Sequence, residues 1–356
     1  MGEIMENLME KLQTDFFKGV LAQSGSSIPG VPIILGYSIW AYSHHTGKTA
    51  ANIMNSGIEH AKAQLYVANK YNLPFVVTFT DLNIIGEAFG AKLTYLPDVI
   101  PVHESPAISQ IEDIDNLELL DPFIDGRMPK IIQTAKYFNK NFKKKEHVLM
   151  AGCEGPITAA GSIWGMENLM RNMINNPDLV HKILDVSSKT IINFLNAQLE
   201  QGTEFVTLAD PSASCTCISP EFFKKFAYRY YRKIVKKVNS PIFMIHICGE
   251  VLNILDQLIR VPKLMIVSVD DVNMERAKEI IGKKFIILMG NVSTSIIRYG
   301  TPLQVEEEVK RVITEAGKGG KLLLSSACDL SPGTPPENIW AMLEATKKYG
   351  TFPLNI

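Results

Sequence analysis

A histidine and a cysteine stand two residues apart at the end of one apolar run, in PIFMIHICGE (241–250). In a β-strand, residues i and i+2 point to the same side, so His246 and Cys248 are expected to face the same space. Imidazole nitrogen and cysteine sulfur are both zinc ligands. The spacing therefore predicts a metal site at the end of a strand.

A third candidate ligand, Cys328, ends another apolar run, KLLLSSACD (321–329). One imidazole and two thiolates form a soft donor set that favours zinc. Three protein ligands leave a fourth position open, as in catalytic zinc sites. The alternative is that Cys248 and Cys328 are small core residues and His246 is a hydrogen-bonded core histidine. The position of Cys328 at the end of a separate run favours the metal interpretation.

The other cysteines give weaker signals. Cys215 and Cys217 form a second Cys-x-Cys pattern in SASCTC without a nearby histidine, and Cys153 ends a further apolar run. We expect all three to be ordinary core or loop residues. Five cysteines, an odd number in a chain of this length, indicate thiols or metal ligands rather than a disulfide framework.

Eight short apolar runs recur along the chain, and helical patterns separate most of them. They cover 31–39, 74–81, 147–155, 205–214, 241–249, 264–271, 284–293 and 321–329. Continuous apolar runs are typical of buried parallel strands. Eight strands alternating with helices predict an α/β fold, a (β/α)₈ TIM barrel, with a doubly wound sheet as the alternative. We expect one domain over 1–356, with a helical lead-in at 1–30 and an insertion over one face at 82–145.

Polar residues gather at the ends of these runs, where a barrel of this type places its active site. Glu154, Asp210, Asp270 and Asn291 each follow or close an apolar stretch. Core packing does not explain them, because buried polar groups cost free energy unless they are partnered. We predict Glu154, Asp210 and Asp270 as catalytic candidates and Asn291 as a substrate contact.

Composition excludes several classes of protein. The chain has 356 residues, 46% of them hydrophobic, and a net charge of −1 from 36 basic and 37 acidic residues. Without a basic stripe, nucleic acid is not expected as a partner. No apolar run approaches the roughly 20 residues of a membrane span, and the N-terminus lacks the apolar segment of a signal peptide. We therefore expect a cytoplasmic protein without a membrane partner.

Two motifs are incomplete. HHTGKT (44–49) resembles the end of a phosphate-binding loop, but Tyr42 stands where that pattern needs glycine. MIHICG contains the His-x-x-Gly part of the Asp-x-His-x-x-Gly signature of corrinoid-binding modules, but Met244 stands at the aspartate position. The chain is therefore not expected to carry its own cobalamin.

Several segments together resemble the uroporphyrinogen decarboxylase superfamily. They are HICG (246–249), TPPEN (334–338) after Cys328, ADPSAS (209–214), GNVS (290–293) and CEGP (153–156). The likeness is greatest to the zinc-dependent methylcobamide:coenzyme M methyltransferases, and it covers 145–350 well and 1–145 loosely. It implies a (β/α)₈ barrel and a zinc held by His246, Cys248 and Cys328. It also implies methyl transfer between methylcobalamin on a partner corrinoid protein and a thiol such as coenzyme M.

The resemblance extends to further residues. In that branch an acidic residue stands at the position of Asp270, which implies a fourth zinc ligand or a group that supports the ligands. Apart from the resemblance, His44, His45 and Lys48 follow the first apolar run and are candidates for binding an anionic thiol tail, the alternative being a solvated loop.

Other activities remain open. True decarboxylases resemble one another in an arginine-rich N-terminal motif, whereas this chain has no arginine before Arg127 and has SIWAYSHHTGKT (38–49) in that region. A substrate with several carboxylates needs guanidinium partners, so methyl transfer is favoured. The alternatives are another methyl donor or acceptor (tetrahydrofolate, a methoxylated compound), a decarboxylase-like lyase, or a non-catalytic barrel that binds a corrinoid protein.

Overall fold

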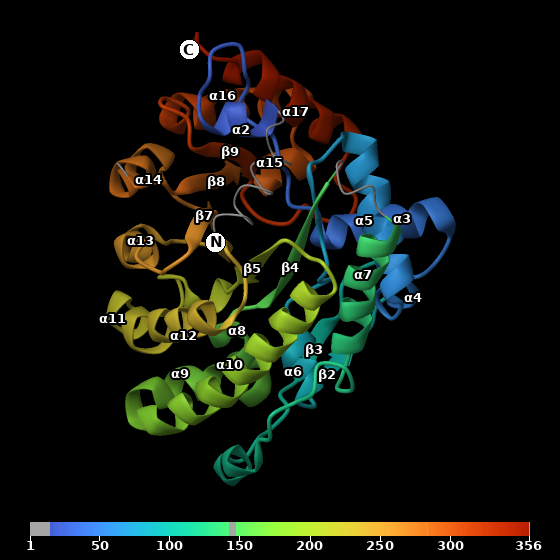
Figure 1. Ribbon diagram of the computed structural model, residues 1–356, viewed down its shortest axis with the longest axis vertical. Helices are drawn as coiled ribbons and strands as arrows, with labels where there is room; N and C mark the ends of the chain where they lie inside the picture. Colours follow the sequence, from blue (N-terminus) through green and yellow to red (C-terminus); the bar gives the residue numbers. More distant parts are fainter. Residues whose placement is uncertain (1–14, 142–146, 283, 356) are drawn as a thin grey trace.

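A curled sheet of seven parallel strands forms the centre of the molecule (Figure 1). The computed structural model describes residues 15–141, 147–282 and 284–355. The strands are paired in the order β1-β4-β5-β6-β7-β8-β9. Their bounds are β1 Phe75–Val77, β4 Val148–Glu154, β5 Phe205–Ala209, β6 Phe243–Ile247, β7 Leu264–Val269, β8 Ile287–Val292 and β9 Leu322–Ser326. Every residue of β4, β5, β6, β8 and β9 is buried, as the continuous apolar runs predict.

The eighth position of the barrel is filled by an extended segment, residues 29–33, rather than by a full strand. It bridges β9 in parallel at Gly30–Leu324 and again at Ile33–Asp329, past the end of the strand. The backbone N–H of Leu324 donates to the Pro29 carbonyl over 2.9 Å. The fold is the predicted α/β barrel of the TIM type, with this segment set against its last strand.

The prediction of a strand over 31–39 is wrong from Leu35 onward, where helix α3 (Leu35–Thr46) begins. Pro32 has no N–H to donate to a ladder, which limits how far a strand can run here. Helix α3 also lacks a side-chain cap of its own at Ile34. Its start is held instead by Asp329, a residue almost 300 positions away that no local pattern reveals.

Helices surround the sheet on its outer side (Figure 1). The first described helices are α2 Asp15–Val20, α3 Leu35–Thr46, α4 Ala50–Met54, α5 Gly57–Tyr71, α6 Ile84–Ala88 and α7 Met128–Asn141. Next come α8 Pro156–Trp164, α9 Met166–Asn175, α10 Pro177–Glu200, α11 Pro220–Phe222 and α12 Arg229–Lys237. The last are α13 Leu252–Leu258, α14 Met274–Ile281, α15 Thr294–Tyr299, α16 Pro302–Ala316 and α17 Pro336–Gly350. Short 3₁₀ helices cover Ile111–Asn116 (η1) and Pro211–Ala213 (η2), and a π-helix (η3) covers Phe223–Tyr228. None of the helices in the described ranges is long and apolar enough to cross a membrane.

The connection from β1 to β4 consists of a segment that leaves the barrel and a helix that belongs to the barrel wall. After α6, an antiparallel pair, β2 Lys92–Thr94 and β3 Val102–Ser105, leaves the barrel, and η1 follows before α7. The expected lead-in at 1–30 lies partly outside the described residues, which begin with α2. The single-domain assignment stays a prediction.

A buried ion pair fastens this connection to the barrel. Arg127, just before α7, is 4% exposed and forms a two-pronged contact with Asp81, which follows β1, at 2.8 and 3.0 Å. The same guanidinium also pairs with Glu87 on α6. Burial alone would raise the pKa of Asp81, but Arg127 outweighs it and the pKa lies below its usual value. The carboxylate is therefore charged and depends on Arg127.

We predict that Arg127→Met lowers the free energy of unfolding by about 3–5 kcal/mol, because it leaves a charged carboxylate buried without its partner. Urea unfolding measures the change. The control is Arg171→Met, which removes an exposed pair with Glu167 on α9 and is expected to cost less than about 1 kcal/mol. Folding lowers the pKa of Asp81, so the ionised carboxylate adds to the free energy of unfolding above pH ~4. This contribution is lost as the pH falls through the pKa of Asp81 in the folded protein. Equal losses in the two variants would contradict this role for Arg127.

Candidate metal centre

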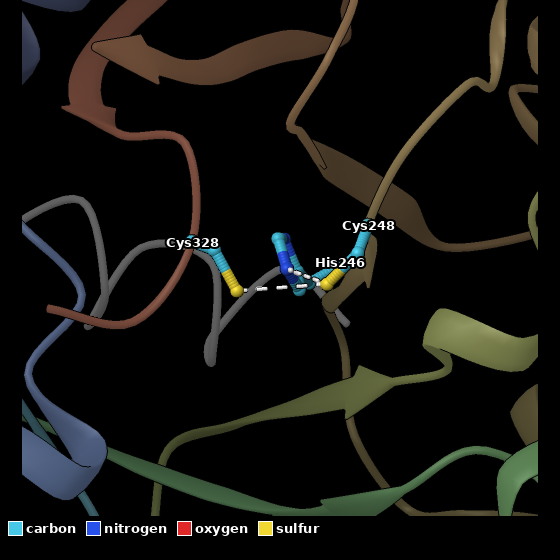
Figure 2. A group of neighbouring side chains, drawn as sticks. All are labelled: His246, Cys248 and Cys328. Atoms are coloured by element: carbon cyan, nitrogen blue, oxygen red, sulfur yellow. Dashed lines mark hydrogen bonds between the residues drawn. The ribbon is translucent and has the colours of Figure 1, made fainter. Parts of the chain in front are cut away.

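Three side chains from two separate strand ends, those of β6 and β9, meet at the carboxyl-terminal end of the barrel (Figure 2). His246 lies in β6, Cys248 directly follows that strand, and Cys328 lies two residues past the end of β9. Their ligand atoms all lie within 4.8 Å of one another. His246 Nε2 is 3.2 Å from Cys248 Sγ, which is 3.5 Å from Cys328 Sγ. Within the described residues, this is the one group of three or more His, Cys, Asp or Glu side chains with such spacing.

The strand register fixes the orientation of the imidazole. His246 pairs with Ser268 of β7, and His246 Nδ1 lies 2.9 Å from the Ser268 hydroxyl oxygen. This bond leaves Nε2 directed toward the two sulfurs. Metal-binding histidines usually hold their other ring nitrogen in this way. Sequence reasoning did not assign a role to Ser268; its place at the equivalent point of the next apolar run was the available signal.

Cys328 is positioned by the closure of the barrel. Asp329 Oδ2 accepts a 2.7 Å hydrogen bond from the Gly36 N–H at the start of α3, and the Leu330 N–H donates to the Ile33 carbonyl. A Cβ at position 36 would lie 2.9 Å from Asp329 Oδ2, so glycine is needed for this approach. The loop that carries Cys328 is therefore tied to the segment that fills the eighth position.

Asp270 supports the loop on the other side. Its carboxylate accepts a 3.0 Å hydrogen bond from the N–H of Gly249, the residue after Cys248. Gly249 has φ +71°, a conformation that favours glycine, and a Cβ there would lie 2.6 Å from Thr216 Oγ1. Asp270 is not a member of the closely spaced ligand group. Its placement suits a residue that positions Cys248, and its role as a ligand stays a prediction.

The hydrogen bond between the two sulfurs couples the two thiols. A hydrogen bond with Cys248 lowers the pKa of Cys328 to about 4, and His246 adds to this effect while burial opposes it. The same hydrogen bond, together with burial and the nearby carboxylates, raises the pKa of Cys248 above its usual value. A divalent cation bound here would take both sulfurs as thiolates, because the metal ligand is the thiolate.

Two of the predicted catalytic carboxylates are buried anchors of neighbouring helices. Glu154, at the end of β4, accepts from the Ile85 N–H at 2.6 Å at the start of α6, and burial raises its pKa to about 8. Asp210, after β5, accepts from the N–H and hydroxyl of Thr158 at 2.8 and 2.7 Å and from Tyr231 at 2.8 Å. Neither lies on the wall of the cavity at the metal residues.

Asn291 acts on the loop after β7. Its Nδ2 donates to the carbonyls of Asp270 and Val272, at 2.7 and 2.9 Å. The side chain therefore holds the segment that carries Asp270. Its predicted contact with substrate is not tested by these bonds.

The structure does not bring His44, His45 and Lys48 to the metal residues. They stand at or just past the end of α3, whose 12 residues span roughly 18 Å from the start that contacts Asp329. His45 stacks on Tyr66, and Lys48 pairs with Glu59. None of the three lines the cavity. Their assignment to an anionic substrate tail stays a prediction.

The remaining cysteines are free thiols, as expected from their number. Cys153 is fully buried and burial raises its pKa well above the usual value. Cys217 is exposed and Cys215 is half-buried. None of them joins the ligand group.

A cavity of about 300 Å³ runs from the metal residues into the barrel. His246, Cys248 and Cys328 lie on its wall, and apolar side chains from β1, β4 to β9 and the 31–35 segment form most of the rest. A ligand at the metal site would thus enter a largely dry space.

Comparison with known proteins identifies the family. The uroporphyrinogen decarboxylase (URO-D) profile matches residues 21–349. The chain belongs to the uroporphyrinogen decarboxylase family. This confirms the resemblance predicted from the sequence segments.

The relatives include enzymes of two kinds. A methylated-thiol–coenzyme M methyltransferase of Methanosarcina mazei is 27% identical over 315 residues, which cover 87% of this chain and 79% of that protein. The methylcobamide:CoM methyltransferase MtaA of Methanosarcina barkeri is 28% identical over 274 residues, 75% of this chain and 78% of that protein. A uroporphyrinogen decarboxylase of Pseudoalteromonas atlantica is 25% identical over 297 residues, 79% of this chain and 80% of that protein. The methyltransferase relatives confirm the predicted enzyme class.

A solved methyltransferase from Methanosarcina mazei has the same fold. It superposes with a TM-score of 0.83 at 24% identity and covers 95% of this chain and 98% of its own. The predicted barrel is confirmed by this match.

We predict that Ser268→Ala weakens metal binding by about 10–100-fold, because it removes the group that orients the His246 ring. Competition with a zinc indicator measures the affinity. The matched control is Ser188→Ala on α10, whose buried hydroxyl has no partner in the structure. An unchanged zinc affinity in Ser268→Ala would contradict the role of Ser268.

Proposed function

We propose that this protein is a zinc-dependent methyltransferase that moves a methyl group between a corrinoid protein and a thiol activated at the zinc. The observation that carries the proposal is the His246–Cys248–Cys328 group on the wall of an apolar cavity. The names of the methyltransferase relatives, which include methylcobamide and coenzyme M, support it.

The donor set fits zinc in type and spacing. Tetrahedral ligand atoms at zinc bond lengths of about 2.0–2.3 Å lie roughly 3.5–3.8 Å apart. The nitrogen–sulfur and sulfur–sulfur distances of 3.2 and 3.5 Å differ from this by only a few tenths of an ångström. The half-buried cysteines leave the remaining side of the group facing the cavity.

Each neighbouring residue has a defined task in this proposal. When bound, zinc supplies the positive charge that ionises a thiol placed in its open position. Ser268 holds the His246 ring, and Asp270 holds the loop after Cys248. The two cysteine ligands keep the site electron-rich, which favours a reactive sulfur. The apolar wall excludes water from the reacting sulfur.

The transfer balances without a further reactant. The substrate thiol gives its proton to solvent, and its sulfur forms a bond to the methyl carbon. The carbon–cobalt bond of the methylated corrinoid breaks, and its electron pair stays on cobalt. Because the sequence lacks the corrinoid-binding signature, a separate protein presents the methyl group at the barrel mouth.

A decarboxylase-like activity is the second candidate, since decarboxylases are among the relatives. That chemistry needs cationic groups to grip several carboxylates. Arg127, the first arginine of the chain, is buried between Asp81 and Glu87 and does not line the cavity. The histidine and cysteine donor set favours methyl transfer. The pairing of Arg127 with two carboxylates disfavours decarboxylation, because Arg127 is not free to bind a substrate carboxylate.

We predict that Cys328→Ala removes most of the zinc and leaves the barrel folded, because the ligand stands on a loop beyond the core strands. Metal analysis of purified protein and circular dichroism measure the two effects. Cys217→Ala, which changes an exposed thiol, is the control and should keep about one zinc per chain. Full zinc content in Cys328→Ala would refute the ligand assignment.

Substrate thiols are expected to release a proton when they bind to the zinc-loaded protein, because the ligand is the thiolate. Titration in weak buffer with a pH indicator measures the release, and loss of the methylcobalamin spectrum reports transfer. If zinc is present but no thiol releases protons or consumes methylcobalamin, thiol activation is wrong. Transfer involving tetrahydrofolate or a methoxylated compound would then be the reaction to test.

A further inference from the structure

The cavity at the metal residues is small and largely apolar. Its volume of about 300 Å³ lies at the lower end of ligand-binding pockets, which span roughly 300–1,000 Å³. Apolar side chains such as Met150, Met244 and Ile266 form most of its wall. A thiol that binds the metal would place the rest of its body against these groups.

The helix terminus at the cavity is already occupied. The start of α3 offers the kind of backbone N–H group that binds anions. Here the Gly36 N–H donates to Asp329 Oδ2 over 2.7 Å. An anionic ligand would have to displace this carboxyl group.

The second acidic residue on the cavity wall, Asp81, is paired with a buried arginine. Asp81 lines the cavity, and Arg127 pairs with both Asp81 and Glu87. Both oxygens of Asp81 are engaged, because they accept from Arg127, from the Thr80 hydroxyl and from the Asn83 N–H. Arg127 therefore offers no free positive charge to a substrate.

The side-chain amide donors on the wall are engaged within the protein. Gln64 Nε2 donates to Ser38 over 2.7 Å, and Asn83 Nδ2 donates to the Pro101 carbonyl over 3.3 Å. Over the part of the chain that the structure describes, no lysine or arginine lines the cavity. A sulfonate or carboxylate would be desolvated here without a cationic partner, which is strongly unfavourable.

We propose that the thiol substrate of this site is small and uncharged, an alkanethiol or its methyl thioether, rather than an anionic thiol such as coenzyme M. This inference rests on the proposed function and narrows its substrate class. The transfer is the one already written: the alkanethiol loses its proton to solvent and gains the methyl group, and the corrinoid keeps the electron pair. In the reverse direction the methyl thioether is the donor.

Three thiols of equal length test the charge preference on the unmodified, zinc-loaded protein. They are 1-propanethiol, 2-mercaptoethanesulfonate (coenzyme M) and cysteamine, which are neutral, anionic and cationic at the far end. We expect kcat/KM for methylcobalamin consumption, corrected for the thiolate fraction of each free thiol, to favour 1-propanethiol by about tenfold or more, a difference of about 1.4 kcal/mol. Titrations that follow proton release on binding are expected to rank the three thiols in the same order.

A designed cation provides an independent test. Ile100 lines the cavity, is half-buried, and its Cγ2 lies 3.4 Å from where a Gly36 Cβ would stand. Ile100→Lys is expected to raise the ratio of kcat/KM for coenzyme M over that for 1-propanethiol by about tenfold. Ile100→Met, which keeps the wall apolar, is the matched control and should leave the ratio unchanged.

The outcomes separate the two proposals. Equal or better use of coenzyme M or cysteamine by the unmodified protein overturns the inference and leaves the proposed function standing. Failure of all three thiols to release protons or consume methylcobalamin overturns the proposed function itself. An unchanged ratio in a folded Ile100→Lys counts against the inference; if that variant does not fold, the preference of the unmodified protein decides.

Discussion

The contact between the 29–36 segment and β9 is the interaction on which the rest of the site depends. Gly30 and Ile33 bridge to Leu324 and Asp329, and this pairing fills the eighth position of the barrel. The same contact sets the start of α3 through the Gly36–Asp329 hydrogen bond. Because Asp329 adjoins Cys328, the contact that closes the barrel also places the third residue of the candidate metal centre. Residues 31–35 of this region also line the cavity.

The metal residues are held by partners on the neighbouring strands and loops. His246 is oriented by Ser268, and the loop after Cys248 is held by Asp270, which Asn291 in turn supports through the backbone. These bonds fix ring and loop before any metal binds. The hydrogen bond between Cys248 and Cys328 keeps their sulfurs 3.5 Å apart. A site arranged in this way loses little conformational freedom on binding a cation, which favours tight binding.

The residues on the cavity wall indicate which reaction the site suits, in a family that contains both decarboxylases and methyltransferases. Decarboxylation of a polycarboxylate needs exposed guanidinium groups, whereas the guanidinium of Arg127 is buried in an ion pair that anchors the β1–β4 connection. Here the cavity combines two thiols, an imidazole and apolar side chains. Such surroundings suit a small sulfur compound held at a metal, because its only strongly polar atom is the one the metal takes.

The sequence by itself determined the strands and the local half of the site. Seven of the eight apolar runs each contain one strand of the central sheet, since strands buried on both faces must be apolar, and the two-residue period places His246 and Cys248 on one side. The tertiary structure alone decided that Cys328 joins them, that Ser268 orients the histidine and that 35–39 is helical rather than extended. Asp329 holds the start of that helix from 293 residues away, and His44, His45 and Lys48 are thereby carried away from the cavity. A period of two or 3.6 residues reports which face a side chain takes, but contacts between distant segments depend on how the sheet curls and closes.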